Sequence, residues 1–143
     1  MRALIDGSVL LDVLQNKEPF VHSSTLILKL CEVHQIEGIV SALSFVNVVC
    51  IMRRELLPSK MKKYLDMMKL IFTFADLETE YLYSASMLNW VNYEDSIQYI
   101  IATKLQAEYI VTSNEQNFEL SVIPVISPSN FLMKIYPQYS EII

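Results

Sequence analysis

Residues 1–14 have the sequence Met-Arg-Ala-Leu-Ile-Asp-Gly-Ser-Val-Leu-Leu-Asp-Val-Leu. Residues 3–5 form a short apolar run without polar alternation, which is typical of a strand that is buried on both faces. An acid, Asp6, follows this run directly, and the segment after it is again mostly apolar. The stretch therefore predicts a buried strand that ends at a carboxylate and passes into a helix.

The same order recurs along the chain. Short apolar runs also lie at residues 38–40, 72–74 and 109–111; helical periodicity follows the first two, and a polar loop follows the third. Alternation of strands and helices indicates a parallel sheet that is covered by helices. The predicted fold class is therefore α/β, a three-layer α/β/α domain with a central parallel sheet.

Several elements have predicted bounds. A helix is expected over residues 21–35, with the packing stripe Leu26, Leu28, Leu30 and Val33. The clearest amphipathic helix begins near Asn92 and has one apolar face, made of Ile97, Ile100, Ile101 and Leu105. Two prolines flank residues 125–126, which predicts a short edge strand, and a last helix should follow over residues 130–135.

Length and composition predict one domain. The chain has 143 residues, of which 52% are hydrophobic, so it can bury one sizeable core. We expect this domain to cover residues 1–135 and a C-terminal tail to cover residues 136–143. Residues 39–52 are interpreted as a buried helix, too short for a bilayer, and Cys31 and Cys50 as small core residues. The sequence shows no signal peptide, which predicts a cytoplasmic protein without a membrane association.

The net charge of -5 argues against a general nucleic-acid coat protein, which would normally be basic. Most of the basic residues nevertheless gather in one section, at Arg53, Arg54, Lys60, Lys62, Lys63 and Lys69. This section could contact phosphates, or it could simply be a solvated helix face.

Polar residues lie at four points that the predicted sheet should bring together. They are Asp6, Asn47 with its helix start, Glu94 with Asp95, and residues 112–114. Ligands of open parallel sheets collect at the carboxyl ends of the strands. Converging carboxylates repel one another unless a cation lies between them, so this edge predicts a site for Mg²⁺ or Mn²⁺.

The order of these segments resembles the PIN-domain family. Residues 6–14 look like the opening of that family, in which an aspartate is followed by Thr-Asn and an apolar helix. Residues 41–47 are similar to its Ser-x-x-Thr-x-x-Glu segment, and residues 95–102 resemble the segment with its third acid. Residues 109–118 look like its strand and its Thr-Arg-Asn-x-x-Asp-Phe loop, so the resemblance runs from residue 1 to about residue 132.

The sequence departs from the family pattern at the acids. Asp6 and Asp95 keep their carboxylates, with Glu94 as a helper, whereas Asn47 replaces a Glu and Asn117 replaces an Asp. An asparagine can supply an oxygen ligand but no negative charge, so metal affinity should be weak.

The resemblance implies a ribonuclease that acts on single-stranded RNA, similar to the toxins of toxin-antitoxin pairs, with an antitoxin partner and a homodimer. In the family, the ions activate a water and bind the scissile phosphate. The residues expected to act are Asp6, Asp95, Glu94, Asn47 and Asn117, and the metal ligands Asp6, Asp95 and Asn114. The alternative is a catalytically silent PIN-like module that binds RNA or protein. An unrelated nucleotide-binding domain would lack its glycine-rich loop, because the chain has only two glycines.

Each candidate also has a purely structural interpretation. Asp6 could cap the following helix, and Asp95 could favour the dipole of its own helix. Asn114 and Asn117 are common turn formers. Asn47 needs a hydrogen-bond partner among its apolar neighbours, either a backbone group or the polar site.

Overall fold

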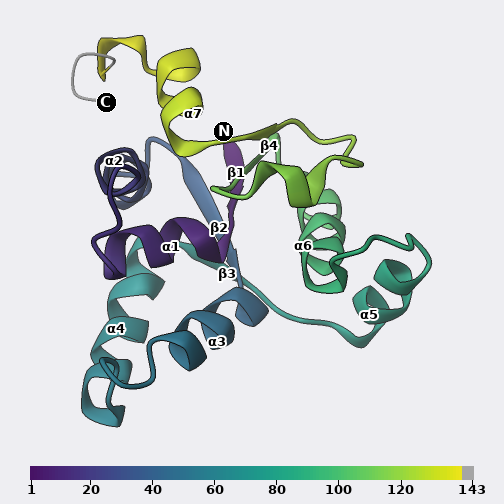
Figure 1. The fold of residues 1–143 in the computed structure, drawn as a ribbon, viewed down its shortest axis with the longest axis horizontal. Coiled ribbons are helices and arrows are strands. Elements are labelled where there is room, and N and C mark those ends of the chain that lie inside the picture. The colour runs from purple at the N-terminus through teal and green to yellow at the C-terminus, as the bar shows by residue number, and fades with distance from the viewer. Residues whose placement is uncertain (140–143) are drawn as a thin grey trace.

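The computed structural model describes residues 1–139, which form a parallel sheet with helices on both faces (Figure 1). The strands are β1 (Arg2–Ile5), β2 (Glu37–Ser41), β3 (Thr73–Ala75), β4 (Tyr109–Val111) and β5 (Val125–Ile126). The helices are α1 (Gly7–Leu14), α2 (Val21–Glu32), α3 (Ala42–Ile51), α4 (Pro58–Ile71), α5 (Thr79–Ser86), α6 (Tyr93–Lys104) and α7 (Pro128–Ile135). Two short 3-10 turns, η1 (Glu115–Phe118) and η2 (Pro137–Tyr139), complete the described chain.

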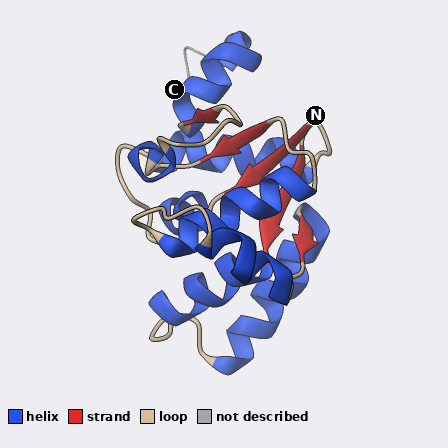
Figure 2. Cartoon of the chain, turned by 90° about the vertical axis from the view of Figure 1, so that its right-hand side faces the viewer, coloured by secondary structure: helices blue, strands red, loops and turns tan. Residues whose placement is uncertain are grey.

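The strand order is β3-β2-β1-β4-β5, and all four pairings are parallel. The arrows of the strands accordingly run in the same sense (Figure 2). β1 lies in the middle, where Leu4 is paired with Ile39 of β2 and with Ile110 of β4. The residue that follows the central strand is therefore surrounded by the carboxyl ends of its neighbours.

Each face of the sheet carries its own apolar core. The core that α1, α2, α4 and α7 cover includes Ile5, Ile27 and Phe131, and the core beneath α5 and α6 includes Leu4, Ile101 and Phe118. Ile5 and Leu4 alternate between the two faces because successive side chains of a strand point in opposite directions. The predicted three-layer α/β/α fold is thereby confirmed.

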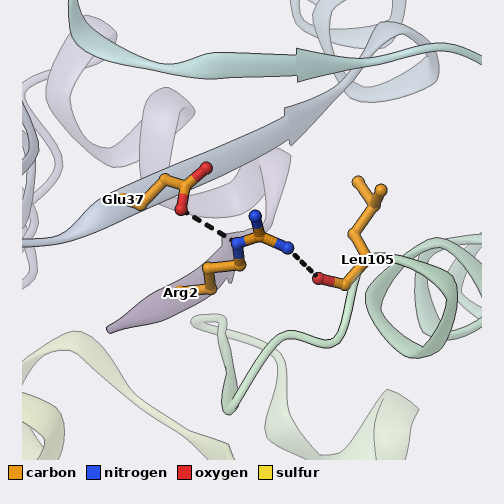
Figure 3. A network of polar contacts seen from close by, with 3 residues as sticks. All are labelled: Arg2, Glu37 and Leu105. Atoms are coloured by element: carbon orange, nitrogen blue, oxygen red, sulfur yellow. Dashed lines mark hydrogen bonds and ion pairs between the residues drawn. The ribbon is translucent and has the colours of Figure 1, made fainter.

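Arg2 ties the amino ends of two strands to a helix (Figure 3). Its Nε donates to Glu37 Oε2 at 2.9 Å, and its Nη1 donates to the carbonyl of Leu105 at 2.9 Å. This contact joins β1 and β2 to the end of α6 on the side opposite the carboxyl ends of the strands. Because both charged side chains are about half exposed, we expect it to contribute little to stability.

Some predicted bounds were wrong. α2 ends at Glu32 and not at residue 35, because His34 has a positive φ of 60° and the amides of His34 and Gln35 bond back to α2. Its buried face consists of Ile27, Leu30 and Cys31 together with Ser23 and Ser24, whereas Val33 is exposed. α7 begins at Pro128, two residues early, since Ser127 Oγ accepts from the amide of Asn130.

The interpretation of residues 39–52 as one buried helix was also wrong. The segment is a strand up to Ser41, whose hydroxyl caps α3 by accepting from the amide of Ser44. One face of α3 is exposed at Val46, Cys50 and Ile51, so Cys50 is not a core residue, whereas Cys31 is buried as expected. Of the predicted tail, residues 137–139 form η2, and residues 140–143 lie outside the described residues. Within residues 1–139, none of the helices is both long enough and apolar enough to cross a membrane.

Gly38 provides a test of the packing between β2 and its helices. A Cβ at this position would lie 2.6 Å from Cys31 Sγ and 2.8 Å from Phe72 Cδ1. We therefore expect Gly38→Ala to lower the free energy of unfolding by about 1–3 kcal/mol, as overpacking usually does. Gly7→Ala is the matched control, because its Cβ would meet only ordinary contacts, the nearest at 3.5 Å. Equal urea midpoints for the two variants would contradict the expectation.

Candidate functional site

A cavity of about 210 Å³ lies at the carboxyl ends of the strands. Residues from four separate segments line it: Asp6 after β1, Asn47 on α3, Glu94 and Asp95 at the start of α6, and Asn114 and Asn117 beyond β4. All six residues that the sequence singles out thus meet at one cavity. Among the described residues that line it, there is no Lys, Arg or His, so the cavity carries negative charge without a compensating protein cation.

Asp6 is held by hydrogen bonds that leave it facing this cavity. It occupies the N-cap position of α1, yet its side chain makes no capping hydrogen bond. Its Oδ2 accepts instead from Ser8 Oγ at 2.7 Å and from Thr112 Oγ1 at 2.8 Å, and its Oδ1 accepts from Gln98 Nε2 at 3.3 Å. The capping interpretation therefore does not account for Asp6, which is only 8% exposed.

Gln98 connects Asp6 to the beginning of α3. Its side chain is 2% exposed, its Oε1 accepts from Ser41 Oγ at 2.6 Å, and its Nε2 also donates to Ser44 Oγ. A single amide therefore joins α6 to β1 and to the turn that leads into α3. The sequence reasoning missed Gln98. Its position three residues after Asp95, on the same face of α6, is the signal that could have identified it.

Asp95 lies beside Asp6 and is also buried. Its backbone amide donates to Asn92 Oδ1 at 3.1 Å, so Asn92 is the residue that caps α6. The pKa of Asp95 is raised from 3.8 to about 7, chiefly because the side chain is buried; the charges of Asp6 and Glu94 add to the increase, whereas a side-chain hydrogen bond with Asn117 opposes it. Two carboxylates thus share a cavity in which both cannot easily ionise.

The side chain of Asn47 is hydrogen-bonded to Glu94, which also lines the cavity. Its Nδ2 donates to Glu94 Oε1, which links the middle of α3 to the first turn of α6. The amide therefore pairs with the polar site and not with a backbone group.

The loop after β4 is fixed by hydroxyl groups. Thr112 Oγ1 accepts from the amide of Asn114, and Ser8 Oγ accepts from the amide of Ser113, each at 3.0 Å. A third buried carboxylate, Asp12, accepts from Ser113 Oγ at 2.6 Å and from Ser24 Oγ at 3.0 Å. These contacts hold the loop against α1 and α2, a role that the sequence analysis did not assign to Asp12.

The side chains at the cavity are of the types that could hold a dication. Asp6 and Asp95 repel each other, and amide oxygens of Asn47, Asn114 and Asn117 lie in the same lining. Mg²⁺ and Mn²⁺ prefer such oxygen ligands, and a cation between the two acids would relieve their repulsion. Over residues 1–139, however, no three His, Cys, Asp or Glu side chains are grouped as a metal site requires.

Comparisons with known proteins identify a family model that matches the sequence and solved structures that share the fold. The family model described as PIN domain matches residues 2–116. One similar structure is a chain in the crystal structure of VapBC2 from Rickettsia felis bound to a DNA fragment from their promoter, with a TM-score of 0.66, 12% identity, and coverage of 88% of this chain and 97% of that chain. Another is VapC20 of Mycobacterium tuberculosis, a sarcin-ricin loop cleaving toxin, with a TM-score of 0.59, 7% identity, and coverage of 76% and 86%. No curated protein matches the sequence significantly.

Removing the Gln98 amide should loosen the fold around Asp6. Gln98→Leu leaves the Ser41 hydroxyl and Asp6 Oδ1 each without one buried partner, which should cost roughly 1–3 kcal/mol of unfolding free energy. Urea denaturation measures the loss. Gln15→Leu, at an exposed glutamine that ends α1, is the matched control and should be nearly neutral. A similar small effect for both would show that the Gln98 network is not stabilising.

The raised pKa of Asp95 should appear in the pH dependence of stability. Between its ordinary value of 3.8 and about 7, the folded protein keeps a proton that the unfolded chain has lost, so stability falls as pH rises through this window. Asp95→Asn removes this loss. In EDTA, its melting temperature should exceed that of the wild type on the order of 5 °C more at about pH 8 than at about pH 4.

Asp76→Asn, at an exposed carboxylate, is the control and should show no such pH-dependent gain. A constant difference between Asp95→Asn and the wild type at both pH values would mean that the pKa of Asp95 is not raised in the folded protein.

Proposed function

The chain belongs to the PIN-domain family, and from this premise we propose that it is a metal-dependent nuclease that acts slowly on single-stranded RNA. The observation that carries the proposal is the convergence of Asp6 and Asp95 on one cavity at the carboxyl ends of the strands. A buried carboxylate whose pKa is raised, in part by a neighbouring acid, is typical of sites that bind a cation or a proton.

Each polar residue of the cavity has a proposed role. Asp6 and Asp95 would hold the ion, and Asn114 or Asn117 would complete its ligands from the loop side. Glu94 or Asn47 would orient the attacking water, and their mutual hydrogen bond keeps both side chains at the cavity. When bound, Mg²⁺ or Mn²⁺ would lower the pKa of a water and neutralise charge on the phosphate.

The charge of the site supports low activity. Asn47 and Asn117 stand where the family pattern has acids, and each neutral amide removes one attraction to a dication. We therefore expect weak metal binding and slow cleavage. The same substitutions favour the second candidate function, a silent module that binds RNA or protein without cleaving it.

A toxin role and its partners extend the proposal. The similar structures include VapBC2 and the toxin VapC20, which supports a toxin-type nuclease with an antitoxin. Exposed apolar side chains could bind an antitoxin or a second copy of the chain; they lie on α3 and α4 at Val46, Ile51, Met67 and Leu70. The basic section is exposed and could contact RNA, but Lys62 is paired with Asp66. A cytoplasmic location stays a prediction of the sequence.

Restoring the missing charge tests the nuclease. Asn47→Glu with Asn117→Asp adds two anionic groups to the cavity, so Mn²⁺ should bind more tightly, although the metal-free protein should be less stable through repulsion. Added Mn²⁺ should then raise the melting temperature of the double variant by several degrees more than that of the wild type, because a ligand of the folded state stabilises it. Cleavage of single-stranded RNA should rise in parallel.

The control adds Asp6→Ala to the double variant, and it should abolish both gains. If the double variant shows no larger Mn²⁺ shift than the wild type, positions 47 and 117 do not face a common ion. The silent module would then replace the nuclease.

A further inference from the structure

A second and larger cavity adjoins the candidate site. It has a volume of about 540 Å³ and lies between the loop before α6 and the turn η1. Asn92 and Asn117 line both cavities, so the two share a wall. Asn92 caps α6 through the amide of Asp95, which fixes the shared wall relative to the carboxylates. Whatever occupies the larger cavity therefore lies directly beside Asp95.

Aromatic rings and carboxamides line this second cavity. The Trp90 ring is stacked on Tyr99 with a centroid distance of 4.9 Å and meets Phe118 edge-on at 6.1 Å. The Tyr93 ring is 46% exposed, and its hydroxyl is fixed by donating to the carbonyl of Leu82 at 2.7 Å. Both rings are thus held in place with surface that remains open to a ligand.

Four carboxamides, Asn89, Asn92, Gln116 and Asn117, supply the polar part of the lining. A carboxamide both donates and accepts hydrogen bonds, which matches the mixed edges of nucleobases. Glu119 is the one charged residue in the described lining, so the cavity does not suit a phosphate. The combination of flat rings and amides is the chemistry with which proteins hold unpaired bases.

We propose that this cavity binds one nucleobase of single-stranded RNA, next to the nucleotide whose phosphate enters the carboxylate site. The inference rests on the proposed function, because it assigns a subsite to the same substrate. Its volume falls in the range of about 300–1,000 Å³ that is usual for small ligands and suits a single nucleotide, whereas a protein partner would need an extended surface. The Trp90 and Tyr93 rings contact the face of the base, and the carboxamides contact its edges.

Trp90 is the single tryptophan of the chain, so its fluorescence reports on this cavity directly. Hexa-adenylate in the presence of Mn²⁺ should quench Trp90 emission in a saturable manner. An abasic ribose-phosphate hexamer of the same length carries the same phosphates and should leave the emission nearly unchanged. Equal quenching by the two oligomers, or no quenching at concentrations where fluorescence anisotropy shows bound RNA, would overturn the subsite.

Tyr93 provides a matched pair of variants. Tyr93→Ala removes a stacking surface and should weaken binding of hexa-adenylate on the order of tenfold. Tyr93→Phe keeps the ring and loses only the bond to Leu82, so its affinity should stay close to that of the wild type. Thermal melting checks that both variants are folded. Equal affinities of Tyr93→Ala and the wild type would contradict the stacking role.

Cleavage is measured in parallel on the double variant Asn47→Glu with Asn117→Asp, whereas the Trp90 response is taken from the wild type, because Asn117 itself lines the larger cavity; together the two measurements separate the two proposals. Cleavage without a response of Trp90 would refute the base subsite and leave the nuclease in place. A base-dependent response of Trp90 without cleavage would support the subsite in a silent RNA-binding module. Absence of any RNA binding by anisotropy would refute both the subsite and the nuclease.

Discussion

The carboxylate of Asp6 is the point on which the arrangement of the site depends. It follows the central strand β1, and it accepts hydrogen bonds from Ser8 on α1, Thr112 after β4 and Gln98 on α6. An ionised buried carboxylate without such donors would be costly. The need to satisfy Asp6 therefore fixes three further segments relative to the sheet, and with them the positions from which the other polar side chains reach the cavity.

The neighbouring Asp95 shows the electrostatic cost of this arrangement. The N-cap Asn92 and the dipole of α6 favour a negative charge at its position, whereas burial and the charge of Asp6 oppose it and raise its pKa to about 7. The opposing effects are larger, so Asp95 is partly protonated near neutral pH unless a cation arrives. Under the proposed function, a cation bound between the two acids would relieve this repulsion and so stabilise the folded protein.

The sequence predicted the sheet, and the convergence of six polar residues on one cavity, for the same reason. Buried strands such as residues 3–5 and 109–111 are recognisable by their apolar runs, and parallel strands necessarily bring their carboxyl ends to one edge. The role of Gln98 could not be read in this way, because a polar residue in a helix is usually exposed and its partners at Ser41 and Ser44 are more than fifty residues away in the chain. The end of α2 was missed because the left-handed conformation of His34 is uncommon for a residue other than glycine.

The pair of Asn47 and Glu94 explains how the site retains negative charge while the α3 position is neutral. A carboxylate at position 47 would face Glu94 directly, in a cavity where Asp6 and Asp95 already repel each other. The amide of Asn47 replaces that repulsion with a hydrogen bond, which favours the fold; if the site binds a dication as proposed, the neutral amide would also lower its affinity. Two of the three acids at the cavity come from one wall, because Glu94 and Asp95 are adjacent in the chain and both lie at the start of α6. The negative charge is therefore distributed unevenly around the cavity. Its three acids come from only two segments, and the side near α3 and η1 carries carboxamides in place of carboxylates.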